Sequence, residues 1–157
     1  MSGQYPPQLT KKMKDSFQKF LMLIDNAIED LEKLMNGTHF KTKLNGSLES
    51  LDFVEQFYKA VVEGVVKIEI PMERLEAWIA TYIGEVFIKN VGGYWVLGDL
   101  PNDHFGTPVI ANYLKSNPAV ARFPINRVHF FAKNKNAGEF KKMIQMGLED
   151  LKHEQIH

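Results

Sequence analysis

The chain has 157 residues, with 19 lysines and arginines, 19 aspartates and glutamates, five histidines and no cysteine. This length fits one hydrophobic core, so we expect a single domain over residues 1–157, with a flexible N-terminal segment at residues 1–9. The balanced charge and an ordinary 24% share of charged residues exclude a disordered tail and a strongly basic nucleic-acid binder. The lack of cysteine also excludes a disulfide-rich secreted module.

We expect a cytoplasmic protein that does not enter a membrane. The sequence starts without the basic region and following apolar region of a secretory signal. The longest apolar run, Phe20–Ile24, is far shorter than the roughly 20 residues that a membrane-spanning helix needs.

Three helices are predicted in the first part of the chain. Apolar residues recur at helical spacing and predict a helix over about residues 10–35, with Thr10 as its N-cap. We expect a second helix over residues 47–64 and a third, started by a proline, over residues 71–90. Between them, Val65–Ile70 alternates in a way that is typical of a strand but that also suits an extended connector.

The pattern changes after the glycine pair that follows the third helix. Residues 94–97 and 108–113 are predicted to form two antiparallel strands, joined by a turn at residues 98–107. A short helix is expected over residues 124–131, and a final helix after residue 138. The chain is therefore predicted to have a mostly helical α+β fold, with about five helices packed on a short antiparallel sheet.

The C-terminus carries the sequence His-Glu-Gln-Ile-His, which fits a zinc-binding helix motif. In such a site two histidines one turn apart bind the metal, and the glutamate activates a water molecule. Here the second histidine, His157, is the last residue of the chain, and helix ends fray. We therefore interpret His153 and His157 as surface residues of a helix end and predict no metal site.

A carboxylate and imidazole cluster is the other candidate for chemistry. The turn after the first strand holds Asp99, Asp103 and His104, but its spacing does not fit a calcium loop, which needs a glycine where His104 stands. These side chains are either an acid–base group or ordinary turn residues. On the third helix, Glu85 has two alternatives: a surface pair with Lys89, or a buried position with Lys89, an indole or a tyrosine hydroxyl as its partner. The glycine before it, Gly84, is expected to permit close backbone approach by a neighbour.

Other signatures of catalysis are missing from the sequence. The glycines at 92, 93 and 98 do not have the spacing of a dinucleotide-binding loop, and no G-K-[ST] phosphate loop occurs. There is no cysteine and no G-x-S-x-G nucleophile motif. We therefore assign no catalytic residue and no cofactor.

Charge is distributed unevenly along the chain. Residues 49–103 hold ten acidic and four basic side chains, a net charge of −6, whereas residues 122–142 hold six basic and one acidic, a net charge of +5. The basic segment either forms a contact surface for an acidic partner or pairs with the acidic helices inside the fold. A protein partner is favoured over nucleic acid, which would need a larger basic excess. The candidate binding residues are Glu85, Trp95, Asp99, Asp103, His104, Arg122, Arg127, Lys133 and Lys135.

The segment from Tyr82-x-Gly-Glu85 to Gly92-Gly93-x-Trp95 resembles a signature of small, uncharacterised bacterial domain families. In these families a helix that ends in a glycine pair leads into a tryptophan-bearing strand, a second strand and C-terminal helices. Some members occur near toxin–immunity systems. The resemblance covers residues 75–131 and implies a fold and a possible bacterial immunity or accessory role, but it carries over no functional residue.

The leading hypothesis is a non-enzymatic protein-interaction module. The alternative is a small hydrolase that uses Glu85, Asp99, Asp103 and His104. A third hypothesis makes the first helix a stripe that pairs two copies of the chain into a homodimer.

Overall fold

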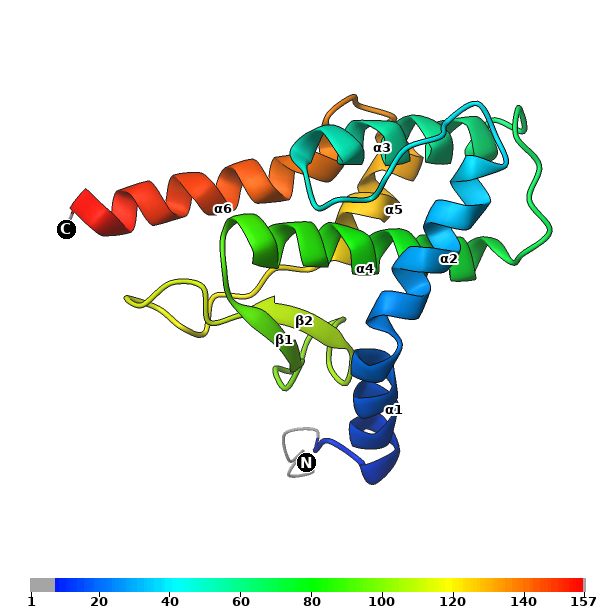
Figure 1. Ribbon diagram of the computed structural model, residues 1–157. Coiled ribbons are helices and arrows are strands. Elements are labelled where there is room, and N and C mark those ends of the chain that lie inside the picture. The colour runs from blue at the N-terminus through cyan, green and yellow to red at the C-terminus, as the bar shows by residue number, and fades with distance from the viewer. Residues whose placement is uncertain (1–7, 157) are drawn as a thin grey trace.

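The computed structural model describes residues 8–156 and has a mostly helical α+β fold, as predicted (Figure 1). Its helices are α1 (Lys11–Met22), α2 (Ile24–Asn36), α3 (Leu48–Val62), α4 (Met72–Asn90), α5 (Pro124–Asn134) and α6 (Glu139–Ile156), and its strands are β1 (Tyr94–Leu97) and β2 (Pro108–Ala111). Within residues 8–156 no helix is long and apolar enough to cross a membrane. Most of the predicted segment 1–9 lies outside the described residues.

The first helix differs from the prediction of one helix over residues 10–35. It divides at Leu23 (φ −103°, ψ 7°), whose N–H is shared between the carbonyls of Lys19 and Phe20, each at 3.1 Å. α1 packs on the strand hairpin, where the Phe20 ring lies 4.9 Å from that of Trp95, whereas α2 packs on α4. We attribute the bend to these two different packing partners, and it is why the helices number six rather than five in the described part.

The predicted helix starts and connector have clear local causes. The side chains of Thr10 and Ser47 cap α1 and α3 by accepting hydrogen bonds from the N–H groups of Met13 (3.1 Å) and Ser50 (3.2 Å). The segment Val65–Ile70 forms no strand, so the connector alternative is the correct one.

Helix α4 is the centre of the core. Ile79, Ile83, Val86 and Phe87 have no exposed surface, and the helix packs against α2, α5 and α6. In Figure 1 α3 lies above α4 and the sheet lies below it. α4 therefore lies between the strand hairpin and α3 and gives the hairpin a surface to pack on.

The two predicted strands pair in antiparallel fashion, with Trp95 opposite Ile110. The second strand ends at Ala111 rather than at residue 113, because Asn112 adopts a left-handed conformation (φ 65°) that a strand cannot continue. Ile110 also exchanges two backbone hydrogen bonds, of 3.0 and 2.8 Å, with Arg122. The chain that leads into α5 is thereby fixed to the outer edge of β2.

Three tyrosine hydroxyls join elements that are distant in sequence. Tyr58 of α3 donates to Glu76 of α4, Tyr82 of α4 accepts from the N–H of Gly46 at 3.0 Å, and Tyr113 donates to a carboxylate of α6 at 2.9 Å. Burial away from water raises the pKa of all three hydroxyls above the ordinary value of 10.0. The folded chain therefore holds these protons more tightly than the unfolded chain does.

Stability should consequently fall in alkali. The unfolded chain releases the tyrosine protons as the pH passes about 10, while the folded chain retains them, so the free energy of unfolding declines above that pH. Urea denaturation between about pH 8 and about pH 11 measures this slope. In Tyr58→Phe the slope should be shallower, because one proton with a raised pKa is gone. An unchanged slope in this variant would show that Tyr58 does not contribute.

A buried carboxylate holds the start of α6. Glu55 of α3 is 5% exposed and accepts hydrogen bonds from the N–H groups of Gly138 (2.8 Å) and Phe140 (3.0 Å). These N–H groups lie at the helix N-terminus, where they lack intrahelical partners and where a negative charge is stabilising.

Replacing this carboxylate should therefore destabilise the fold. We expect Glu55→Ala to lower the free energy of unfolding by about 2–3 kcal/mol and Glu55→Gln, which keeps one acceptor, by less. The exposed Glu49→Ala on the same helix is the control and should stay within about 0.5 kcal/mol of the wild type. Urea denaturation compares the three; equal losses at positions 55 and 49 would refute the capping role.

Candidate functional site

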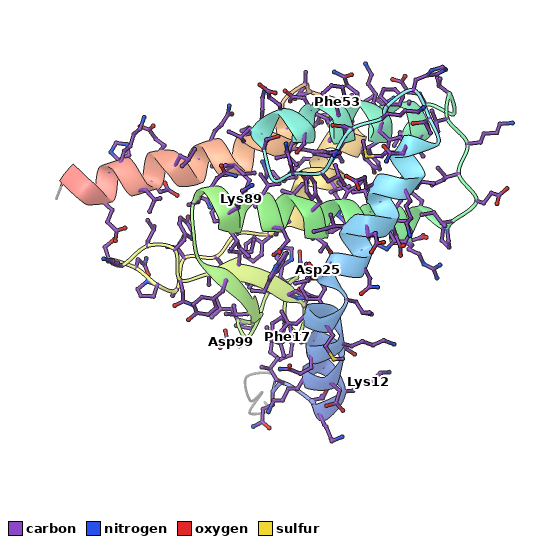
Figure 2. All side chains as sticks on the ribbon, viewed as in Figure 1. Lys12, Phe17, Asp25, Phe53, Lys89 and Asp99 are labelled. Carbon is purple, nitrogen blue, oxygen red and sulfur yellow. The ribbon has the colours of Figure 1, made fainter. Side chains whose placement is uncertain are left out.

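The indole of Trp95 packs on α4 at a glycine. A Cβ atom on Gly84 would overlap the Trp95 ring, so only glycine permits this contact. The close neighbour is a side chain rather than the backbone that the sequence analysis expected. The indole N–H donates to Glu85 Oε2 at 2.9 Å, which makes the indole the partner of Glu85. The alternative pair with Lys89 is wrong: Lys89 donates instead to the carbonyl of Asn45 at 2.6 Å, on the side of α4 away from the hairpin (Figure 2).

The turn between the strands holds His104 in a fixed position. Its ring stacks on Phe123, with the ring centres 4.0 Å apart and the planes 8° from parallel. The backbone N–H of His104 donates to the Asn102 side chain at 2.8 Å, and the backbone carbonyl of His104 accepts from the Thr107 hydroxyl at 2.7 Å. The side-chain amide nitrogen of Asn126 lies 3.2 Å from His104 Nε2. The backbone bonds hold the turn, while the stacking on Phe123 and the Asn126 contact hold the imidazole in place.

On one side of His104 lies an open groove of about 500 Å³, which we call the α4 groove. Small residues of α4 form its floor: Ala77, Ala80 and Thr81. Phe20 of α1 and Trp95 of β1 form one aromatic wall. Apolar residues such as these, with a few polar groups, are typical of a binding site.

The opposite side of the α4 groove belongs to α5 and the hairpin turn. Pro124 and Ile125 add apolar surface, while Asn126, His129 and His104 supply polar groups. Asp103 is the one carboxylate among the residues that line the groove. The groove is thus apolar at its floor and polar at its edge.

The four residues of the predicted hydrolase site do not line one hollow. Asp99 lies in a second hollow of about 430 Å³ on the other side of His104, whereas Asp103 lines the α4 groove. Glu85 lines neither hollow and is bonded to Trp95. Among the residues that the structure describes, no three His, Asp or Glu side chains are placed to hold a metal ion.

Three of the four predicted basic binding residues form ion pairs within the chain. Arg122 contacts Asp150 at 2.6 Å and also donates to Tyr113 at 3.0 Å. Arg127 contacts Glu139 at 2.7 Å and Lys135 approaches Glu63 to 3.9 Å. The exposed Lys133 remains, and it follows His129 by one helical turn on α5.

The C-terminal histidine pair is described only in part. His153 lies exposed on the last turns of α6 and is 3.4 Å from Glu149. His157 lies outside the described residues.

Several residues of the α4 groove escaped the sequence analysis. Phe20 belongs to an apolar stripe that is typical of a core helix, and Asn126 and His129 match no motif. One signal for the groove was available in the sequence. Ala77, Ala80 and Gly84 follow each other at helical spacing, so one face of α4 carries no large side chain.

The fit of Trp95 to Gly84 gives a test of the site. We expect Gly84→Ala to lower the free energy of unfolding by about 1–3 kcal/mol, because the new methyl group displaces the indole. In a Trp95→Ala background the same change should cost much less, because only the end of the Ile110 side chain, 3.2 Å from the added Cβ, remains close and alanine favours helices by about 1 kcal/mol over glycine. Gly37→Ala, where a Cβ meets an ordinary 3.6 Å contact, is the control. An equal cost in both backgrounds would exclude the proposed overlap.

No protein-family model, no curated protein and no solved structure matches the chain. The resemblance to bacterial domain families therefore stays a prediction, and the α4 groove, with Trp95, Asp103 and His104 from the predicted set, is the candidate site.

Proposed function

We propose that the chain is a non-enzymatic, cytoplasmic protein-interaction module that holds an apolar side chain of a partner protein in the α4 groove. The observation that supports this is the groove itself: an open hollow of about 500 Å³ with an alanine floor and an aromatic wall. Large apolar side chains that enter such pockets contribute much of the energy of protein interfaces. The immunity or accessory role that the resemblance implies belongs to this proposal, since such proteins act by holding a partner.

The charge near the groove indicates what surrounds the apolar side chain of the partner. His129 lines the groove, and Lys133 stands one turn further along the same exposed side of α5. Asp103 opposes them from the hairpin turn. A partner segment with a carboxylate beside its apolar anchor would meet Lys133, and charge complementarity of this kind sets specificity and association rate.

The hydrolase alternative is less well supported: of its four residues only Asp103 and His104 line the α4 groove, while Glu85 is bonded to Trp95 and Asp99 lines the other hollow.

The proposal is tested with short fluorescein-labelled peptides and fluorescence anisotropy. The probe peptide carries a central phenylalanine flanked by glutamates; matched peptides replace the phenylalanine by alanine or the glutamates by lysines. We expect the probe to bind most tightly. The variant Ala77→Trp, which fills the groove from an exposed position, should weaken binding by about tenfold or more. Lys133→Glu should weaken it several-fold.

The matched control is Gln145→Trp, which adds the same side chain at an exposed position of α6. It should bind like the wild type. Equal binding by Ala77→Trp, or no preference among the three peptides, would overturn the proposal.

A further inference from the structure

Helices α1 and α2, which we call the arm, carry opposite charges on either side of the bend. α1 has four lysines against one aspartate, and α2 has four carboxylates against one lysine. The bend at Leu23 lies between 12 residues of α1 and 13 residues of α2. The arm therefore has a basic half of 12 residues and an acidic half of 13, with its centre at Leu23.

Large apolar side chains are exposed at this centre. Leu21 is 36% exposed, Met22 79% and Leu23 44%, and no residue of α1 is buried. α1 extends from the helical body beside the hairpin (Figure 1). Phe17 lies on the side of α1 that faces the hairpin, whereas Lys12 lies on the opposite side (Figure 2).

Ion pairs inside the arm account for only part of its charge. Lys11 pairs with Asp15 at 3.1 Å and Lys33 with Glu29 at 3.3 Å, both at exposed positions where such pairs stabilise little. Five charged residues of the arm are exposed and form no ion pair within residues 8–156: Lys12, Lys14 and Lys19 of α1, and Asp25 and Asp30 of α2. These charges are free to meet another molecule.

We infer that the arm docks on the arm of a second copy of the chain, with α1 of each copy against α2 of the other. A two-fold axis that passes between the two arms at their bends produces this arrangement, because it places the basic half of each copy beside the acidic half of the other. Lysines of one copy then face aspartates of the other, and the apolar side chains of residues 21–23 meet at the axis. Any arrangement that places α1 on α1 would set lysines against lysines, which is repulsive.

The inference is independent of the α4 groove. The interface uses the exposed side of the arm, and the groove takes only Phe20 from α1. Since the interface is a single pair of bent helices with charged ends, we expect a reversible dimer that salt weakens.

The test is sedimentation velocity of the full chain over a range of concentrations. We expect the wild type to dimerise at low salt and to dissociate at high salt. The variant Lys12→Glu with Lys19→Glu makes both halves of the arm acidic, and Asp25→Lys with Asp30→Lys makes both halves basic. Each variant should be monomeric alone, and an equimolar mixture of the two should form a heterodimer.

The chain that carries all four substitutions should recover the dimer, because its charges are exchanged. If the lysines of α1 instead bind a lipid surface or another polyanion, that binding should be lost in the variant with Lys12→Glu and Lys19→Glu. It should not return in the chain with all four substitutions. A monomeric wild type at all concentrations, or no heterodimer in the mixture, overturns the inference.

The apolar centre is tested separately, at a position where the folded monomer makes few contacts. Met22→Ser should weaken the dimer about tenfold or more. The control is Val65→Ser, at a residue that is similarly exposed (76%) but lies outside the arm, and it should leave the dimer unchanged. Equal effects of the two substitutions would contradict the placement of Met22 at the interface.

Discussion

The contact between Trp95 and Gly84 determines how three parts of the molecule meet. The indole belongs to the hairpin, its Cζ2 and Cη2 atoms lie closest to Gly84 of α4, and its ring centre lies 4.9 Å from that of Phe20 of α1, with the two rings at 77° to each other. Such aromatic pairs contribute about 0.5–1.5 kcal/mol beyond the apolar area that they bury. The partly buried indole N–H has an acceptor in Glu85, the residue after the glycine, at 2.9 Å. Two adjacent residues of α4 thus provide both the space for the ring and the partner for its polar atom.

The balanced net charge of the chain reflects its internal pairing. The acidic α3 and the basic stretch around α6 meet in the fold, where Lys141 lies 3.2 Å from Asp52 and Glu55 caps the start of α6. Arg127 and Glu139 join α5 to α6. Of the two alternatives for the basic segment, pairing inside the fold therefore accounts for most of its charge and holds the C-terminal helices in place.

Sequence reasoning succeeded where the cause is local. Thr10 and Ser47 cap their helices by accepting hydrogen bonds from N–H groups three residues further along the chain. The two strands pair as predicted because turn-forming residues separate them in the sequence. It failed at the bend of Leu23, because the apolar stripe runs on without a proline or glycine while its packing partner changes from the hairpin to α4. The sequence named Trp95, Asp103 and His104 as candidate binding residues but did not predict the α4 groove that they line, since the α1 and α5 residues that complete it are brought there by tertiary packing.

The absence of buried residues in α1 has a consequence for the groove. A helix with so little buried surface opens at a low free-energy cost, independently of the core, and its amides exchange with solvent early. When α1 detaches, Phe20 leaves with it and the groove loses part of its aromatic wall. The binding-competent fraction of molecules is then the fraction in which α1 is docked, and the apparent affinity scales with that fraction. Any contact that keeps α1 in place, including one with a second copy, raises the affinity of a site that the contact itself does not touch.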